Sequence, residues 1–302
     1  MADDSAPSGI LLVDKPGGMT SHDVVSRARK ALGTRKIGHA GTLDPMATGL
    51  LVLGVGPATR LLTFIVGLDK TYEATIRLGS TTDTDDADGA VTSRADAAAL
   101  ALVDAPAIAE AMAPLAGDIS QVPSTVSAIK VDGRRAYDLA REGAEVSLTA
   151  RDVSVSRFDL LARRDLSDGF DLDVVVDCSS GTYVRALARD LGRSLGVGGH
   201  LTALRRTRIG PFPVQGAASI DQLADAALQT AADVGALLLG RFDATQAEAL
   251  DLRQGKRLVG AADRMAGKRA AAIDPDGMMI GVVHRRGSDV KSEMNLPTGK
   301  YV

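Results

Sequence analysis

The sequence predicts an α+β fold, in which a large mixed, mainly antiparallel sheet carries helices and is followed by a small C-terminal β module. Strand-type segments such as 69–79 and 170–178 do not alternate regularly with helices, so a doubly wound parallel sheet is not indicated. Composition changes near Arg241, where short apolar runs with glycine turns replace an alanine-rich stretch. The 302 residues suffice for two unequal domains. We place them at 9–240 and 241–302.

The composition excludes some classes of protein. A net charge of -3 does not indicate a general nucleic-acid binder, so RNA binding would need a local basic face. The single cysteine, Cys178, cannot form an internal disulfide, which fits the reducing cytoplasm that we expect as the location. We interpret Cys178 as a buried strand residue. No leader or membrane-spanning run is apparent.

Signals for metals and cofactors are also missing from the sequence. The four histidines are scattered, and no cluster of Cys, His and carboxylates has metal-ligand spacing. No phosphate-binding or dinucleotide glycine fingerprint occurs. We therefore expect chemistry without a metal or a cofactor.

The first folded segment is predicted to run from a strand into a helix. Residues 10–13 are apolar and read as a buried strand, and 16–18 form a Pro-Gly-Gly turn. Ser21 is a candidate cap for a helix that ends at Lys30. The predicted inner face of this helix consists of Val24, Val25 and Ala28.

The next segment, 38–49, is rich in glycine and contains one carboxylate, Asp44, directly before Pro45. Proline biases the preceding residue away from helical geometry. The apolar run 50–55 follows as a predicted buried strand, closed by Gly56 and Pro57. A lone acid in a stiff loop beside a strand suits a nucleophile or general base, although most Asp-Pro pairs only begin turns.

Segment 38–49, Gly-His-Ala-Gly-Thr-Leu-Asp-Pro-Met-Ala-Thr-Gly, resembles the catalytic motif of the bacterial tRNA pseudouridine synthase B family. The resemblance implies the pseudouridine synthase fold and conversion of uridine to pseudouridine at position 55, in the T loop of tRNA. It identifies Asp44 as the catalytic aspartate. It also implies that His39 fills the space left by the extruded base, and that Lys15, Pro16 and Thr42 support the loop.

Two further segments carry the resemblance. Residues 69–79 alternate as a strand, and Tyr72 is by default a half-buried strand aromatic. In the family this tyrosine packs on the target base, which loses its stacking partners when it is extruded. We interpret 79–89 as an exposed acidic loop and 93–116 as an alanine-rich surface helix. A basic cluster ahead of the Asp44 loop could hold phosphates: Arg29, Lys30, Arg35 and Lys36.

Residues 121–149 resemble the family's thumb-like insertion, which clamps the T arm, although their charges balance. Strand 170–178 then leads through Gly-Thr-Tyr-Val-Arg into a helix over 186–194. Read alone, Arg185 is most often a surface arginine. The resemblance instead places Tyr183 in the pocket and pairs Arg185 with Asp44, where a guanidinium would favour the ionised carboxylate and orient it.

Segment 198–210 closes the catalytic part, and the resemblance places Leu204 against the flipped base. Residues 219–239 read as helical. The tail 249–302 carries ten Lys or Arg and six Asp or Glu, with short predicted strands. It loosely resembles the RNA-binding PUA domain of related synthases and could equally be a degenerate β cap.

The resulting functional hypothesis is a monomeric tRNA uridine isomerase that acts through Asp44. Two alternatives stay open. A catalytically silent tRNA-binding chaperone or scaffold would not require Asp44, Tyr72 and Arg185 together. An aspartate-dependent hydrolase of nucleotides would need a metal or a second acid, for which the sequence gives no cluster.

Overall fold

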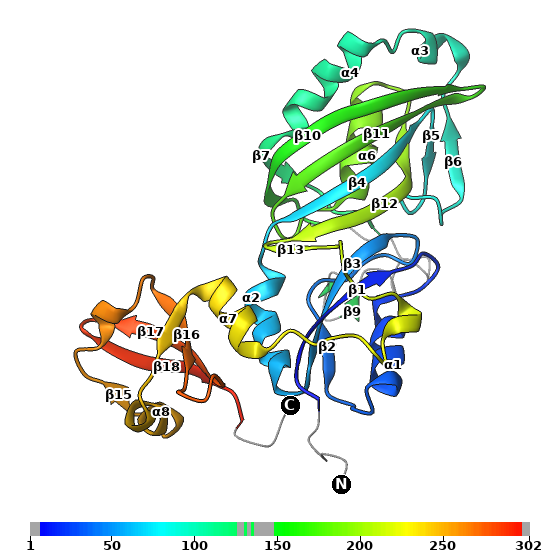
Figure 1. Cartoon of the computed structure of the whole chain (residues 1–302). Coiled ribbons are helices and arrows are strands. Elements are labelled where there is room, and N and C mark those ends of the chain that lie inside the picture. The colour runs from blue at the N-terminus through cyan, green and yellow to red at the C-terminus, as the bar shows by residue number, and fades with distance from the viewer. Residues whose placement is uncertain (1–6, 126–129, 132–133, 136–147, 298–302) are drawn as a thin grey trace. The chain divides into compact units, whose positions relative to one another are not determined.

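The computed structural model describes residues 7–125, 130–131, 134–135 and 148–297. The chain forms two compact units: one contains residues 1–45, 49–66 and 211–302, and the other contains residues 46–48 and 67–210. We refer to them as the Asp44 unit and the Arg185 unit, because these two residues mark the predicted site in each (Figure 1).

The Asp44 unit begins with antiparallel strands and one helix. Strand β1 is paired along its whole length with β3, from Gly9 opposite Val55 to Lys15 opposite Gly49, and the end of β3 also pairs with β2. Helix α1 covers one face with Val24, Val25 and Ala28, as predicted. The elements of this part are β1 (Gly9–Lys15), α1 (Ser21–Ala31), β2 (Ile37–His39), β3 (Thr48–Val55), η1 (Gly56–Leu61) and α2 (Leu62–Val66).

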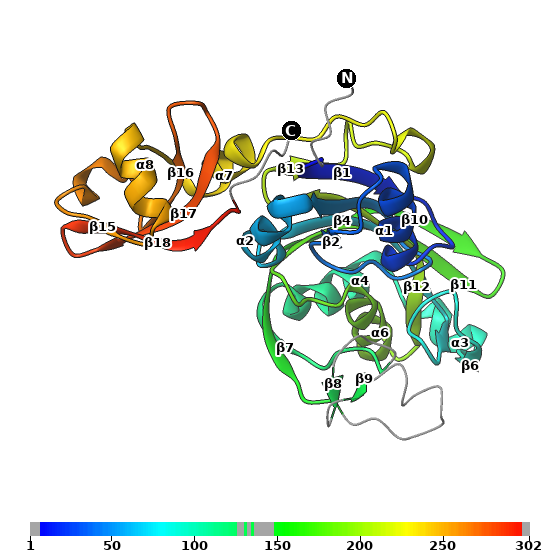
Figure 2. The same ribbon diagram turned by 90° about the horizontal axis from the view of Figure 1, so that it is seen from below.

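The rest of the Asp44 unit contains a second, five-stranded sheet in the order β14-β16-β17-β18-β15. It is antiparallel except for the parallel pair β14 and β16, and it packs α8 over a core that includes Phe242, Leu252 and Val283. Figure 2 labels its strands β15 to β18 and helix α8. The elements are β13 (Phe212–Pro213), η3 (Ile220–Gln222), α7 (Ala231–Leu239), β14 (Arg241–Asp243), α8 (Gln246–Arg253), β15 (Arg257–Leu258), η4 (Ala262–Arg264), β16 (Arg269–Ile273), β17 (Met279–Arg286) and β18 (Asp289–Asn295).

The Arg185 unit is an antiparallel sheet in the order β12-β4-β11-β10-β7, with α6 on one face (Figure 1). The elements are β4 (Lys70–Leu78), β5 (Ser80–Thr82), β6 (Val91–Arg94), α3 (Ala97–Ala101), α4 (Ala105–Met112), η2 (Ala113–Leu115), β7 (Gly117–Gln121), β8 (Lys130–Val131), β9 (Arg134–Arg135), β10 (Arg151–Leu166), β11 (Gly169–Cys178), α6 (Val184–Ser194) and β12 (Gly199–Ile209).

The two faces of β4 differ sharply, as expected for a half-covered antiparallel sheet. Alternate residues from Lys70 to Leu78 are buried on the face that α6 covers. On the other face, strand β11 presents carboxylates that bind side chains of β4, for example Asp173 with Thr75 at 2.8 Å and Asp171 with Arg77 at 2.5 Å. The fold class predicted from the sequence is confirmed by this arrangement.

Several element predictions were wrong in detail. Segment 93–116 is not one helix: after the end of β6 it forms α3, α4 and η2, and Asp104 caps α4 at the break. Segment 219–239 is helical only at η3 and α7, since its middle pairs with β1 through Gln229 and Ile10. The loop 79–89 is not simply exposed: Ser80, Thr82 and Asp86 are buried. Most of the insertion predicted over 121–149, including the helix expected within it at 136–141, lies outside the described residues.

Helix α6 lies directly on the backbone at the start of β12. A Cβ added at Gly192 would lie 2.2 Å from the carbonyl carbon of Gly198, whereas a Cβ at Gly67 would meet nothing within 4 Å. Backbone cannot yield as a flexible side chain does, so the helix itself would have to shift.

We expect Gly192→Ala to destabilise the chain by about 3 kcal/mol, and so to lower the melting temperature by several degrees. Gly67→Ala is the matched control and should leave the melting temperature unchanged or slightly raised. Calorimetry of both variants checks this. Equal melting temperatures for the two variants would contradict the close helix–strand packing.

Candidate functional site

The loop that carries Asp44 is held from one side by a buried lysine. Lys15 is 0% exposed, and its Nζ donates to the carbonyl oxygens of Pro16 at 2.9 Å, Met19 at 2.7 Å and Pro45 at 3.2 Å. The N–H of Gly18 also donates to the Pro45 carbonyl, at 2.9 Å. A buried ammonium is tolerated when acceptors replace its water, and here these acceptors fix the residue that follows Asp44.

The other side of the loop is held by Ser21. Its hydroxyl accepts the N–H of Leu43 at 2.9 Å and lies 3.3 Å from the Leu43 carbonyl oxygen. The prediction that Ser21 caps α1 was wrong: Thr20 is the cap, in a reciprocal pair with Asp23. The residues before and after Asp44 are therefore both bonded to the segment 15–21.

The remaining predicted residues of the Asp44 unit surround this loop. Asp44 is half-buried and Thr42 is exposed. Gly41 has a φ of 95°, a conformation that L side chains rarely adopt, so the chain can turn there. His39 ends β2 and contacts the ring of His22 edge-on, at 5.5 Å between centroids. Pro16 supplies one of the carbonyls that Lys15 binds.

In the Arg185 unit, Tyr72 and Leu204 lie on the same buried face of the sheet. Tyr72 is opposite Arg206, and Leu204 is opposite Ala74. Tyr72 is only 7% exposed, so it is more buried than the half-buried strand position expected from the sequence.

Two cations share this face with Tyr72 and Leu204: Lys70 is 6% exposed and Arg206 is 1% exposed. Burial, reinforced by the positive charge of Arg206, lowers the pKa of Lys70 to about 8. The sequence did not reveal either residue as part of the site. In a strand, residues two apart lie on the same face, so the position of Arg206 two residues after Leu204 was the signal that could have placed it on the buried face of β12.

Arg185 is buried, which excludes the alternative that it is a plain surface arginine. It lies in the first turn of α6, is 3% exposed, and donates from Nη1 to the Thr84 carbonyl at 2.8 Å. The same nitrogen lies 3.4 Å from a carboxylate oxygen of Asp86, which is itself 4% exposed. Asp86 also accepts from the Thr84 hydroxyl and the Asp88 N–H.

The Asp86 carboxylate is the clearest site residue that the sequence did not reveal. A buried ion pair is tolerated only when its remaining hydrogen-bonding capacity is satisfied, and Asp86 meets this condition. The short, turn-rich segment 79–89 contains four acidic residues, and nothing in the sequence singled out Asp86 among them. Its effect is to fix one orientation of the Arg185 guanidinium.

Tyr183 is held through its backbone by Gln121, the last residue of β7. The Gln121 carboxamide accepts from the Tyr183 N–H at 2.9 Å and donates to its carbonyl at 3.1 Å. Arg189, one turn after Arg185, donates to the Val122 carbonyl and pairs with Asp85 at 3.3 Å. The turn before α6 is thereby bonded to the end of β7, where the predicted insertion begins.

Other candidate features of the chain gave no second site. Cys178 is buried, and burial raises its pKa to about 11, so its thiol is unreactive at neutral pH. Within the described ranges, no group of three or more His, Cys, Asp or Glu could hold a metal ion. No helix in this same part of the chain is long and apolar enough to cross a membrane.

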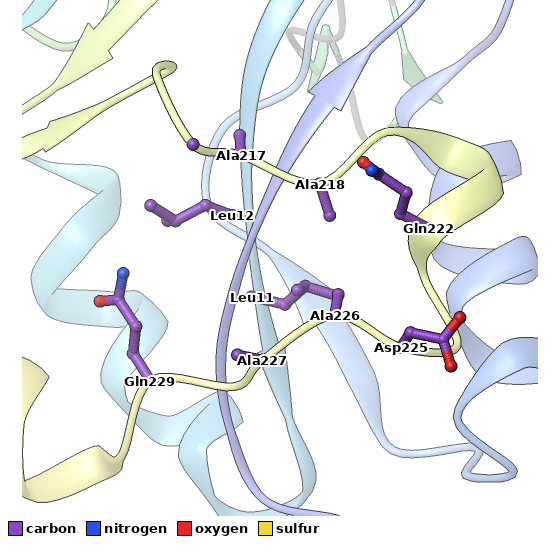
Figure 3. A pocket seen from close by; sticks show the side chains of 10 residues that line it. Leu11, Leu12, Ala217, Ala218, Gln222, Asp225, Ala226, Ala227 and Gln229 are labelled. Atoms are coloured by element: carbon purple, nitrogen blue, oxygen red, sulfur yellow. The ribbon is translucent and has the colours of Figure 1, made fainter.

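A pocket of about 570 Å³ lies along β1, between Leu11, Leu12 and segment 216–229 (Figure 3). The predicted site residues do not line it. Its polar side chains are Gln222, Asp225 and Gln229, all of them exposed. We assign it no role in the chemistry.

Comparison with known proteins gives relatives along almost the whole chain. It is 55% identical over 292 residues to tRNA pseudouridine synthase B of Leifsonia xyli, covering 96% of this chain and 97% of the relative. It is 61% identical over 232 residues to the enzyme of that name from Nocardia farcinica, covering 74% and 75%. A solved structure described as a Cbf5-Nop10-Gar1 complex shares the fold, with a TM-score of 0.68, 22% identity, and coverage of 98% and 91%.

Family models account for consecutive parts of the sequence. Residues 29–184 match the N-terminal domain of the TruB family pseudouridylate synthases. Residues 185–242 match the C-terminal domain of tRNA pseudouridylate synthase B, and residues 239–297 match the C-terminal part of tRNA pseudouridine synthase II. The chain is thus an enzyme of the TruB family of pseudouridylate synthases.

Proposed function

We propose that this enzyme converts uridine to pseudouridine at position 55, in the T loop of tRNA. The observation that carries the proposal is the Asp44 loop, whose flanking residues are fixed by Lys15 and Ser21. The names of relatives at 55% and 61% identity support tRNA as the substrate. The T-loop position is supported by the resemblance of segment 38–49 to the family motif.

The reaction breaks the bond between N1 of uracil and C1′ of the ribose, turns the base, and joins C5 to C1′. C5 loses its hydrogen as a proton, and N1 ends with a hydrogen, so the product is an isomer of the substrate. In our proposal Asp44 acts as the nucleophile at the base or sugar, or assists a glycal-type intermediate. Tyr72 stacks on the extruded base and takes part in proton transfer, while Tyr183 and Leu204 line its pocket.

Arg185 supplies a positive charge in the proposal. Its ion pair with Asp86 and its bond to Thr84 supply a fixed guanidinium. We propose that this guanidinium favours the ionised form of Asp44 when RNA is bound, and that His39 fills the space left by the flipped base. Thr42 belongs to the same loop, and Lys15 and Pro16 support it.

We also propose the domain organisation, the oligomeric state and the cellular location of the enzyme. The catalytic part spans 9–240, with the T-arm clamp in an insertion at 121–149, and the PUA-like module spans 241–302. We propose a monomer that acts in the cytoplasm, in keeping with a single, buried cysteine.

Release of tritium from tRNA labelled at C5 of uridine tests the function directly, because C5 loses its hydrogen only on isomerisation. We expect wild-type enzyme to release tritium stoichiometrically, and Asp44→Asn to lose turnover by several orders of magnitude while tRNA affinity stays within a few-fold. Full turnover by a pure Asp44→Asn preparation would remove Asp44 from the chemistry. Absence of release by the wild type on an unmodified transcript would contradict the function.

Substitutions of Arg185 test its electrostatic role. Arg185→Lys keeps the charge but loses the planar fork, so part of the activity should remain. Arg185→Met removes the charge and should move the acidic limb of the single-turnover pH profile to higher pH, since the ionised Asp44 loses a stabilising charge. If the rate falls while that limb stays in place, Arg185 positions the RNA instead.

A further inference from the structure

Arg189 connects three segments of the Arg185 unit through one guanidinium. It lies four residues after Arg185 in α6, so both side chains leave the same face of the helix. Its Nη2 donates to the Val122 carbonyl at 2.7 Å, and its Nη1 lies 3.3 Å from a carboxylate oxygen of Asp85. Nε and Nη2 also bind the two carboxylate oxygens of Asp190, at 2.9 Å and 3.1 Å. The end of β7, the loop between β5 and β6, and helix α6 therefore meet at this side chain.

Asp85 lies between the two residues that hold Arg185. The acceptors described above for the Arg185 guanidinium are the Thr84 carbonyl, at 2.8 Å, and the Asp86 carboxylate, at 3.4 Å. Thr84 comes directly before Asp85 in the chain, and Asp86 comes directly after it. A movement of Asp85 would therefore displace both groups that orient the guanidinium.

The backbone of Asp85 has a conformation that depends on its surroundings. Its φ is 60°, and within the described ranges no other non-glycine residue has a positive φ. Aspartate adopts this conformation more readily than most residues, but at a cost in energy that surrounding contacts must offset. The Asp85 carbonyl accepts the N–H of Leu201 at 3.0 Å, and its carboxylate is held by Arg189. Arg189 thus helps to keep the loop in the form in which it binds Arg185.

The other contacts of Arg189 belong to firmly packed parts of the unit. Val122 directly follows Gln121, the last residue of β7, which is buried and pairs with Arg151 of β10. Asp190 belongs to α6 itself, and most of that helix is buried. Arg189 therefore joins the loop of Asp85 to a strand end and a helix that are fixed independently of it.

Arg189 is not an ordinary surface ion pair. Such pairs contribute little, and Arg193 on the same helix is an example: its side chain is 75% exposed and lies 3.8 Å from Asp190. The side chain of Arg189 is only 17% exposed, and charges shielded from water interact more strongly. A planar guanidinium can also donate to several acceptors in a fixed arrangement, which an ammonium cannot.

We propose that Arg189 is a positioning residue for the isomerisation: it fixes Asp85, and thereby the orientation of Arg185. The inference rests on the proposed function, in which the Arg185 guanidinium acts on Asp44. Arg189 itself touches no reacting atom. Its loss slows the chemical step of bound tRNA and leaves tRNA affinity almost unchanged, because its charge faces two carboxylates of the protein and not a phosphate.

The experiment compares Arg189→Met with Arg193→Met, which removes the same charge from the same helix and the same partner, Asp190. The isomerisation rate of full-length tRNA is measured in single turnover at saturating enzyme, alongside tRNA affinity and melting temperature. We expect Arg189→Met to be about tenfold slower than the wild type in single turnover, with its affinity within about twofold. Arg193→Met should match the wild type in all three measurements.

Further variants test whether the effect passes through Asp85 and Arg185. In an Arg185→Met background, Arg189→Met should cause no further fall in rate, because the guanidinium that it positions is gone. Asp85→Asn removes the charge from the other partner and keeps a residue type that tolerates positive φ. It should slow the bound rate as Arg189→Met does, and the two changes together should be no slower than the slower one alone. If Arg189→Met does not fold, Asp85→Asn decides by the same measurements.

The outcomes separate this inference from the function itself. Equal bound rates for Arg189→Met and Arg193→Met, with a wild type that isomerises tRNA, would overturn the positioning role and leave the function intact. A full further loss of rate in the Arg185→Met background would overturn it in favour of a general structural role. A loss of tRNA affinity at an unchanged bound rate would overturn it in favour of direct RNA contact. A wild type that does not isomerise tRNA would instead contradict the proposed function.

Discussion

A single buried ammonium determines how the Asp44 loop is held. Lys15 ends β1 inside the unit, and its Nζ binds the turn that follows it and the carbonyl of Pro45, thirty residues further along the chain. Removing a charge from water is costly, so the arrangement persists only because carbonyl oxygens replace that water. The same cost favours one path of the loop, since moving the Pro45 carbonyl away would leave the ammonium with one acceptor fewer.

The Arg185 unit uses the same principle with a different ion. The guanidinium of Arg185 is buried against Asp86, and Gln121 holds the backbone of the preceding turn. Lys70 and Arg206 add two buried cations on the sheet face that carries Tyr72. Each unit thus keeps charged groups under apolar cover at the positions where catalytic residues are predicted, and desolvated charges of this kind act strongly on an anionic substrate.

The fold class and the apolar elements could be predicted because periodicity and turn residues are local signals. Strands β1, β3, β4 and β11 and helices α1 and α6 follow from such patterns. Strand β10 was missed because its second half is exposed and charged, and β12 was missed because Arg205, Arg206 and Arg208 hide its alternation. Alanine-rich segments were predicted to be helical from their high helix propensity. The prediction fails where backbone pairing with another segment overrides that propensity, as it does between Gln229 and Ile10.

The site itself could be predicted only in part. Asp44, Tyr72 and Arg185 were identified because segments of the family motif contain them, whereas their partners depend on contacts between distant segments. Ser21 meets Leu43, Asp86 meets Arg185, and Gln121 meets Tyr183 over separations that no local pattern records. A reading of the sequence also assigns charged residues to the surface, so it underestimates the buried ones.

Amide hydrogen exchange in Lys15→Met tests most directly whether this ammonium fixes the loop. The amides to follow are those of Gly18 and Leu43, which bond Pro45 and Ser21, and the control is Lys30→Met on the exposed side of α1. The account predicts that Lys15→Met lowers the protection of both amides at least about tenfold while amides of β17 keep theirs, and that Lys30→Met changes neither. Unchanged protection of Gly18 and Leu43 in Lys15→Met would contradict it.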